Sequence, residues 1–166
     1  MNSDLISQEN EPQKRRLGVI GAGVMGTGVA QAAQSRGYDV TLVDNSAHQL
    51  EQAQDRIREY ELLAEFSGVV QGDGASEPGK LVLSESLADL RACTFVVENI
   101  SEVVDAKQSV FAALSEHLDD RCTIATNTSA ISITKLASCY RLPANVVGIH
   151  FMNPVAIKPT VELIRG

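Results

Sequence analysis

The stretch GVIGAGVMGTGVAQAAQSRGYDVTLVD (Gly18–Asp44) decides the fold of this chain. Gly21, Gly23 and Gly26 form the pattern G-x-G-x-x-G between a short apolar run and a helix-like segment. The first glycine permits a tight turn, the second lets a pyrophosphate approach the backbone, and the third lets the helix pack closely on the strand. The start of the helix adds free N–H groups and a partial positive charge. The predicted contacts of this dinucleotide-binding turn are Gly21, Gly23, Val24, Met25 and Gly26.

Asp44 strengthens this interpretation, because the glycines alone would also fit a tight turn without a ligand. It ends the next predicted strand, where a carboxylate accepts hydrogen bonds from the adenosine ribose. The alternative is a turn or helix-capping aspartate. A 2′-phosphate about 4 Å from this carboxylate would be repelled by roughly 4 kcal/mol at an effective dielectric constant of about 20. Asn45–Ala47 offers no arginine to offset that repulsion, so the sequence predicts NAD rather than NADP.

Composition restricts the class of protein. The chain has 166 residues and a formal net charge of −7, which indicates one domain and disfavours nucleic-acid binding by charge. No apolar run reaches the length of a membrane span. Residues 1–14 read as a disordered tail, and residues 15–166 as the domain. The three cysteines have no metal-like spacing, which indicates reduced thiols, no metal site and a cytoplasmic protein.

Apolar runs alternate with helical patterns, as in βαβ units. The pattern predicts an α/β fold with a Rossmann-type, doubly wound, mostly parallel sheet. The predicted strands are residues 16–20, 39–43, 81–84, 94–98, 122–126, 145–150 and 160–164. The predicted helices are residues 24–36, 47–66, 103–118 and 132–138, and residues 67–80 read as a long loop.

Polar residues gather where the later strands end, and ligands of doubly wound sheets bind beyond those ends. Glu98 ends one strand, Asn127 and Ser129 follow another, and His150 ends a third. Taken alone, Asn127–Ser129 would read as a helix-capping turn. His150, between two apolar residues, would read more readily as a core histidine than as a catalytic one.

Four segments together resemble a known family. They are the opening stretch and FVVENISEVVDAKQSVF, NTSAISITKLA and GIHFMNPVAIKPTVELIRG. In this order and spacing, from about Leu17 to Gly166, the chain resembles the NAD-binding domain of the L-3-hydroxyacyl-CoA dehydrogenases. The resemblance implies an oxidoreductase of fatty acid metabolism that uses NAD to oxidise a 3-hydroxyacyl thioester to the 3-oxo compound.

The resemblance also implies residue roles. His150 matches the catalytic base, Glu162 the carboxylate that pairs with it, and Ser129 the serine that contacts the reacting oxygen. Asn127 matches a residue near the nicotinamide ribose. Glu102 and Lys107 match family positions on the cofactor side of the cleft, and Glu98, at its strand end, is a further expected cofactor contact. Without the resemblance, Glu102 and Lys107 would read as an ordinary solvated pair at the start of a helix.

Two departures from the family keep alternatives open. The loop Ser67–Lys80 replaces a basic helical segment that helps to hold coenzyme A. Asn99, in VVENISE, resembles a branch of polyketide biosynthesis that oxidises glyceryl or hydroxyacyl groups on acyl carrier protein for hydroxymalonyl or methoxymalonyl units. A non-catalytic NAD-binding module is another alternative. A 6-phosphogluconate-type dehydrogenase is disfavoured, because its chemistry would use a lysine rather than HFMNP.

The family continues with a helical domain beyond the position of Gly166. That domain closes the cleft, supplies an asparagine to the substrate and makes most of the dimer contact, so an oligomer is one expected state. We therefore expect residues 1–166 alone to fold and bind NAD but to turn over very little substrate.

Overall fold

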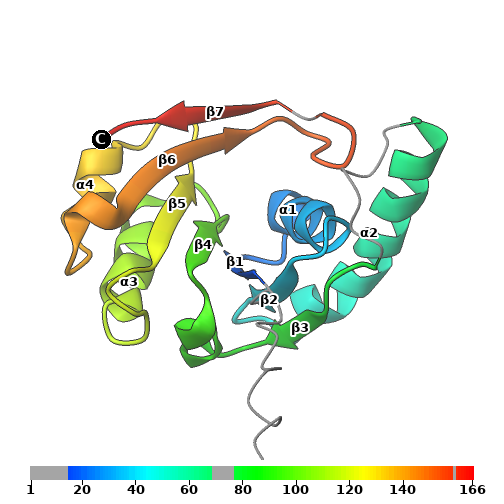
Figure 1. The fold of residues 1–166 in the computed structure, drawn as a ribbon. Helices are drawn as coiled ribbons and strands as arrows, with labels where there is room; N and C mark the ends of the chain where they lie inside the picture. The colour runs from blue at the N-terminus through cyan, green and yellow to red at the C-terminus, as the bar shows by residue number, and fades with distance from the viewer. Residues whose placement is uncertain (1–14, 69–76, 159) are drawn as a thin grey trace, which may run out of the picture.

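The protein is built on a seven-stranded sheet, seen in a computed structural model that describes residues 15–68, 77–158 and 160–166. The strand order is β3-β2-β1-β4-β5-β6-β7 (Figure 1). Neighbouring strands are parallel except β6 and β7, which are antiparallel. The strands are Arg16–Ile20 (β1), Asp39–Val43 (β2), Leu81–Ser84 (β3), Phe95–Glu98 (β4), Thr123–Asn127 (β5), Val146–Phe151 (β6) and Val161–Ile164 (β7). The predicted Rossmann-type sheet is thus confirmed.

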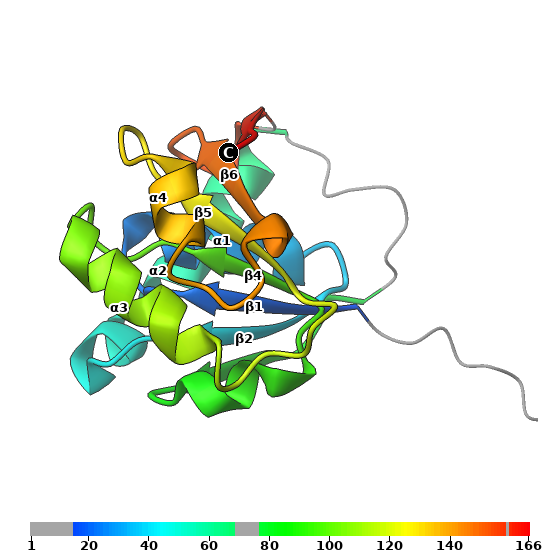
Figure 2. The same cartoon turned by 90° about the vertical axis from the view of Figure 1, so that its left-hand side faces the viewer.

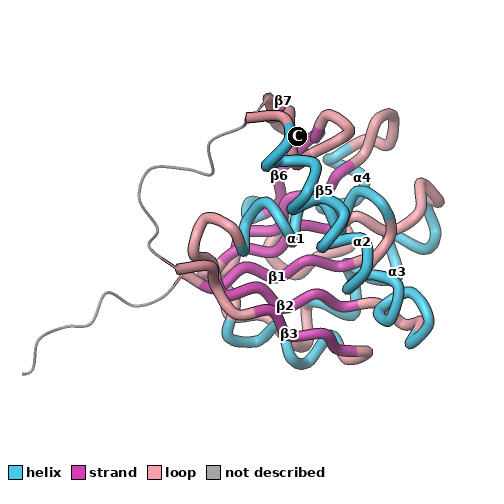
Figure 3. Tube along the Cα trace, turned by 90° about the vertical axis from the view of Figure 1, so that its right-hand side faces the viewer, coloured by secondary structure: helices cyan, strands magenta, loops and turns pink. Residues whose placement is uncertain are grey.

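Helices cover both faces of this sheet. They are α1 (Val24–Gln34), α2 (Ala47–Phe66), α3 (Val104–Leu114) and α4 (Ile133–Ala137), with short 3-10 helices η1 (Leu87–Ala92) and η2 (Pro143–Asn145). Helices α1 and α2 lie on one face and α3 and α4 on the other (Figure 1). Figure 2 shows α3 and α4 in front of the strands, and Figure 3 shows the molecule from the opposite side.

The core has one apolar layer on each face, because successive side chains of a strand point to opposite faces. Strand β1 sends Leu17 and Val19 into the layer under α1 and α2, and Ile20 into the layer under α3. Strand β4 likewise sends Val97 into the layer under α1 and α2, and Val96 into the layer under α3. The strand order determines which side chains meet at the carboxyl edge of the sheet.

The predicted boundaries differ from the structure in a few places. Helix α3 ends at Leu114 rather than Leu118, although Leu118 remains buried in the core. The turn η1 was not predicted, since six residues are too few to show a helical period. The antiparallel direction of β7 follows from its short link to β6, because a parallel neighbour needs a crossover of a dozen or more residues. The predicted tail and residues 69–76 of the loop lie outside the described residues.

Two further expectations concern thiols and membranes. Cys93 and Cys122 are buried and unpaired, and burial raises the pKa of the Cys122 thiol to about 12. Such a thiol is inert at neutral pH. Across the described ranges, no helix combines the length and the apolar character that a membrane crossing requires.

Candidate active site

The turn between β1 and α1 is shaped by its glycines. Gly21 has a φ of +94°, and a Cβ there would lie 2.7 Å from the carbonyl oxygen of Asn99. A Cβ on Gly26 would lie 1.8 Å from the carbonyl oxygen of Gly21. A Cβ on Gly23 would meet nothing within 4 Å. The first and third glycines are therefore required by packing, whereas the second leaves open space beside the backbone.

That open space belongs to a cleft of about 660 Å³. Its walls include Gly21 and Gly23 of the turn, Asp44 and Gln49 from the β2–α2 segment, and Asn99 after β4. A volume of this size is typical of small-molecule sites, and the cleft lies at the carboxyl edge, where doubly wound sheets bind dinucleotides.

Asp44 holds the turn while facing this cleft. One carboxylate oxygen accepts from the N–H of Ala22 at 2.7 Å, and the other accepts from the N–H of Ser46 at 2.9 Å. Each oxygen of a carboxylate accepts about two hydrogen bonds. Asp44 therefore keeps acceptor capacity for ribose hydroxyls after fixing the turn.

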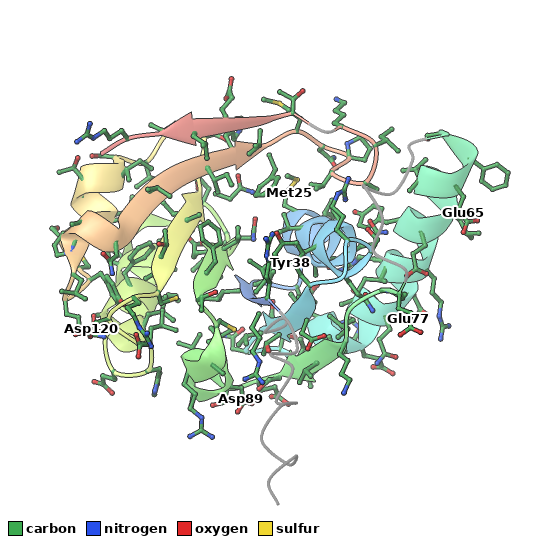
Figure 4. All side chains as sticks on the ribbon, in the orientation of Figure 1. Met25, Tyr38, Glu65, Glu77, Asp89 and Asp120 are labelled. Atoms are coloured by element: carbon green, nitrogen blue, oxygen red, sulfur yellow. The ribbon has the colours of Figure 1, made fainter. Side chains whose placement is uncertain are left out.

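The start of α1 has no competing anion. The helix has no side-chain cap at Gly23 and no acidic residue in its first turn. Val24 is half exposed there, and Met25 lies on the part of α1 that faces β6 (Figure 4). The open space beside Gly23, the uncapped helix start and Asp44 together fit an NAD molecule.

Glu98 and Lys107 form a buried pair beneath this edge. Both side chains are fully buried, and Lys107 Nζ lies 2.7 Å and 2.9 Å from the two carboxylate oxygens of Glu98. Glu98 also accepts from Thr126 Oγ1 at 2.6 Å and from the N–H of Ile100 at 2.7 Å. Lys107 donates to the carbonyl oxygen of Asn127 at 3.2 Å. The pair therefore ties together β4, α3 and β5, and its role as a cofactor contact stays a prediction.

Glu102 holds the turn that follows β5. Its Oε1 accepts from Thr128 Oγ1 at 2.5 Å, from the Ser129 N–H at 2.9 Å and from the Ala130 N–H at 3.3 Å. Lys107 Nζ lies 3.6 Å from its other oxygen. Burial acts to raise the pKa of Glu102, but these hydrogen bonds and the lysine outweigh it, so the pKa lies below its ordinary value. The carboxylate is thus a stable anchor for the Ser129 backbone.

Ser129, His150 and Glu162 form a chain of hydrogen bonds. Ser129 Oγ lies 3.1 Å from His150 Nε2, and His150 Nδ1 lies 3.0 Å from Glu162 Oε2. His150 and Glu162 are directly paired residues of β6 and β7, which places both side chains on one face. All three line a hollow of about 370 Å³. A carboxylate on Nδ1 fixes the tautomer that leaves Nε2 free to accept a proton.

Two asparagines connect this hollow with the cleft. Asn127 Nδ2 donates to Asn99 Oδ1 at 2.8 Å, and Asn99 is part of the cleft wall. The Phe151 N–H, next to His150, donates to Asn127 Oδ1 at 3.4 Å. A group bound between the two asparagines and His150 would therefore touch both sites.

Another cavity, larger than this cleft, lies elsewhere. It measures about 720 Å³, and its lining is mainly apolar, with Tyr38 and Phe95 among the residues. Four basic residues also line it, namely Arg15, Arg16, Arg36 and Lys158. No carboxylate or imidazole occurs among its described lining residues. We place the dinucleotide site at the smaller cleft, because the glycine turn and the Asp44 carboxylate line it and the Asn99–Asn127 contact links it to the hollow of His150.

Sequence reasoning missed several residues that support the site. Thr126 and Thr128 read only as strand-end threonines, yet their hydroxyls bind Glu98 and Glu102. Their position just past a buried strand was the available signal. Arg56 had no local signal, because it contacts the glycine turn from 34 residues away.

Comparison with known proteins agrees with this geometry. Residues 16–166 match the model of the 3-hydroxyacyl-CoA dehydrogenase NAD-binding domain. The chain is 40% identical over 154 residues to a 3-hydroxybutyryl-CoA dehydrogenase of Bradyrhizobium diazoefficiens, covering 92% of this chain and 52% of that protein. It is 36% identical over 151 residues to a probable 3-hydroxybutyryl-CoA dehydrogenase of Deinococcus radiodurans, covering 91% and 54%.

A solved structure agrees as well. The crystal structure of (S)-3-hydroxybutyryl-CoA dehydrogenase from Ralstonia eutropha superimposes with a TM-score of 0.81 at 35% identity, covering 92% of this chain and 54% of that one. The chain thus spans about half the length of these relatives.

The buried pair predicts a strong and non-additive effect on stability. Lys107→Met leaves Glu98 charged, buried and without its partner, so it should lower the free energy of unfolding by about 3–5 kcal/mol. The double variant Glu98→Gln/Lys107→Met removes both charges and should lose much less than the sum of the single variants. Urea unfolding of the four proteins checks this. Additive losses would show that the two side chains do not act as a pair.

The lowered pKa of Glu102 predicts that its contribution to the free energy of unfolding depends on pH. Its pKa is lowered by folding, so its stabilising effect is complete above the unfolded-state pKa of about 4.3 and disappears as the pH falls through the lower folded value. Glu102→Gln should therefore be less stable than the natural protein at pH 7, and the gap should close on acidification. Urea unfolding at a series of pH values measures it. A gap that stays constant down to the lowest pH would contradict the assignment.

Proposed function

The chain belongs to the 3-hydroxyacyl-CoA dehydrogenase family, as its NAD-binding domain, and from that premise we propose that the protein oxidises the 3-hydroxyl group of an acyl-coenzyme A thioester with NAD⁺. The observation that carries the proposal is the hydrogen-bonded chain from Ser129 through His150 to Glu162. The hydrogen-bonded residues Asn127 and Asn99 lie between this chain and the cleft that fits the cofactor.

The cofactor side of the reaction needs binding and orientation from the protein. Bound NAD⁺ supplies the hydride acceptor. The backbone of the glycine turn and the start of α1 hold the pyrophosphate, and Asp44 holds the adenosine ribose. Asn127 orients the nicotinamide ribose. Hydrogen bonds to Asn99 and Phe151 fix the amide of Asn127, which supports this role.

The substrate side needs a base at the hydroxyl oxygen. His150 Nε2 takes the hydroxyl proton as the C3 hydrogen leaves with its electron pair. The Glu162 carboxylate stabilises the resulting imidazolium through Nδ1. Ser129 contacts the same oxygen and holds it beside Nε2. In the reverse direction His150 returns the proton to the 3-oxo oxygen.

Glu98, Glu102 and Lys107 act behind these groups. Glu102 binds the backbone N–H of Ser129, and the buried pair holds the backbone of Asn127. We assign the buried pair to positioning, because neither side chain is exposed. Glu102 is partly exposed and can also meet the cofactor, as the family resemblance implies.

The relatives support one of the two carriers considered for the acyl group. Those reported above are named for coenzyme A substrates, and on that support we propose coenzyme A rather than acyl carrier protein. The loop that raised the alternative lies mostly outside the described residues. An oligomeric state and a cytoplasmic location stay predictions.

Turnover distinguishes this function from a non-catalytic NAD-binding module. Residues 1–166 alone should reduce acetoacetyl-CoA with NADH only slowly, and His150→Gln should lower that small kcat by a further factor of roughly 10²–10⁴. NADH affinity should stay unchanged, since His150 lies outside the cleft. Loss of NADH absorbance and of NADH fluorescence measure the two quantities. His117→Gln, on the turn after α3, is the control. Unchanged turnover in His150→Gln would exclude His150 as the base.

Cofactor choice tests Asp44. The natural protein should bind NADH on the order of 10³-fold more tightly than NADPH, because a repulsion of roughly 4 kcal/mol between the carboxylate and a 2′-phosphate corresponds to that ratio. Asp44→Asn removes the charge but keeps an amide oxygen for the Ser46 N–H. It should therefore reduce the difference between the NADH and NADPH affinities without unfolding the turn. Calorimetric titration of both cofactors measures the ratio. Equal affinities in the natural protein would overturn the choice of NAD.

A further inference from the structure

An arginine from α2 holds the glycine turn from behind. Arg56 Nη1 donates to the carbonyl oxygen of Ala22 at 2.8 Å, and Thr27 Oγ1 donates to the same oxygen at 3.0 Å. Ala22 is fully buried between Gly21 and Gly23. Two donors thus fix the orientation of the peptide that joins Ala22 to Gly23.

The orientation of that peptide determines where the turn offers an N–H group. In a trans peptide the C=O and N–H bonds point in opposite directions. Because the Ala22 carbonyl faces Arg56 and Thr27, the Gly23 N–H faces away from them. Gly23 lines the cleft, with nothing within 4 Å of the position its Cβ would take. Arg56 therefore holds a backbone donor toward the space where a ligand fits.

The guanidinium also reaches the wall of the cleft. Arg56 Nη1 donates to Gln49 Oε1 at 3.2 Å, and Nη2 donates to Gln52 Oε1 at 2.6 Å. Gln49 lines the cleft beside Asp44. Within the described part of the chain, no carboxylate forms an ion pair with Arg56. Its positive charge therefore lies against the Ala22 carbonyl of the glycine turn, and no described carboxylate neutralises it.

We propose that Arg56 is a positioning residue for the pyrophosphate of the dinucleotide. It orients the Gly23 N–H through the Ala22 carbonyl and adds a positive charge behind the turn. The inference rests on the proposed function in one respect, namely that the cleft is the dinucleotide site.

Three variants separate this role from simple support of the fold. Arg56→Met keeps the length of the apolar stem and removes the donors and the charge. Arg56→Lys keeps the charge and one donor group. Arg58→Met is the matched control, because Arg58 lies on the same helix, has a side chain that is 76% exposed and, among the described residues, forms an ion pair only with Asp55, at 3.8 Å.

The ligands isolate the pyrophosphate. NADH binding is followed by fluorescence, and ADP and adenosine are measured by displacement of NADH. Arg56→Met should weaken NADH and ADP by roughly tenfold, the effect of one hydrogen bond to a charged group. Adenosine, which has no phosphate, should bind as before. Arg56→Lys should recover most of the loss, and Arg58→Met should match the natural protein.

Several results would overturn the inference. Unchanged ADP affinity in Arg56→Met would do so, and so would an equal loss for ADP and adenosine, which a merely structural role predicts. Should Arg56→Met not fold, Arg56→Gln replaces it, because its amide keeps a donor without the charge, and the same comparison decides. If the natural protein binds no NADH, the proposed function itself fails. If it binds NADH and only the Arg56 comparison fails, the proposed function stands.

Discussion

The buried ion pair between Glu98 and Lys107 is the interaction on which the arrangement of the site depends. An isolated charge inside a protein is costly, and a buried pair is tolerated only when its remaining hydrogen-bonding capacity is satisfied. Here the Thr126 hydroxyl and the Ile100 N–H donate hydrogen bonds to the Glu98 carboxylate. The Asn127 carbonyl oxygen accepts a further hydrogen bond from the Lys107 ammonium group. Since these partners come from β4, α3 and β5, the pair holds three elements in one register at the carboxyl edge.

This arrangement separates two tasks that the proposed reaction must bring together. The β1–α1 turn and the end of β2 provide free backbone donors and a carboxylate for a dinucleotide. The β6–β7 hairpin provides a histidine oriented by a glutamate. The strand order places β4 and β5 between these two parts, so the residues at their ends, Asn99 and Asn127, form the boundary. Small errors in their position would change the distance between hydride acceptor and base, on which the rate depends strongly.

Much of this could be predicted from the sequence, because strand and helix patterns are local. The glycine turn and Asp44 follow a spacing with a physical reason, and the strand ends place polar residues at one edge. The pairing of Glu98 with Lys107 could not be derived in this way, because Glu98 reads as a strand-end acid and Lys107 as a solvated charge until the packing of α3 is known. The contact of Arg56 with Ala22 was equally hidden, since it depends on how α2 packs against α1. For His150 the local pattern favoured a core residue, and its chemical role could be predicted only from the family resemblance; the pairing of β6 with β7 then places Glu162 beside it.

The central claim is that the carboxyl edge of the sheet, and not the larger apolar cavity, holds NAD. Titration of ¹⁵N-labelled protein with NADH tests it most directly, because the shift of each backbone amide reports on its own surroundings. The account predicts the largest shifts at Gly23, Asp44, Asn99 and Asn127. Shifts gathered instead around Tyr38 and Phe95, which line the apolar cavity, would contradict it.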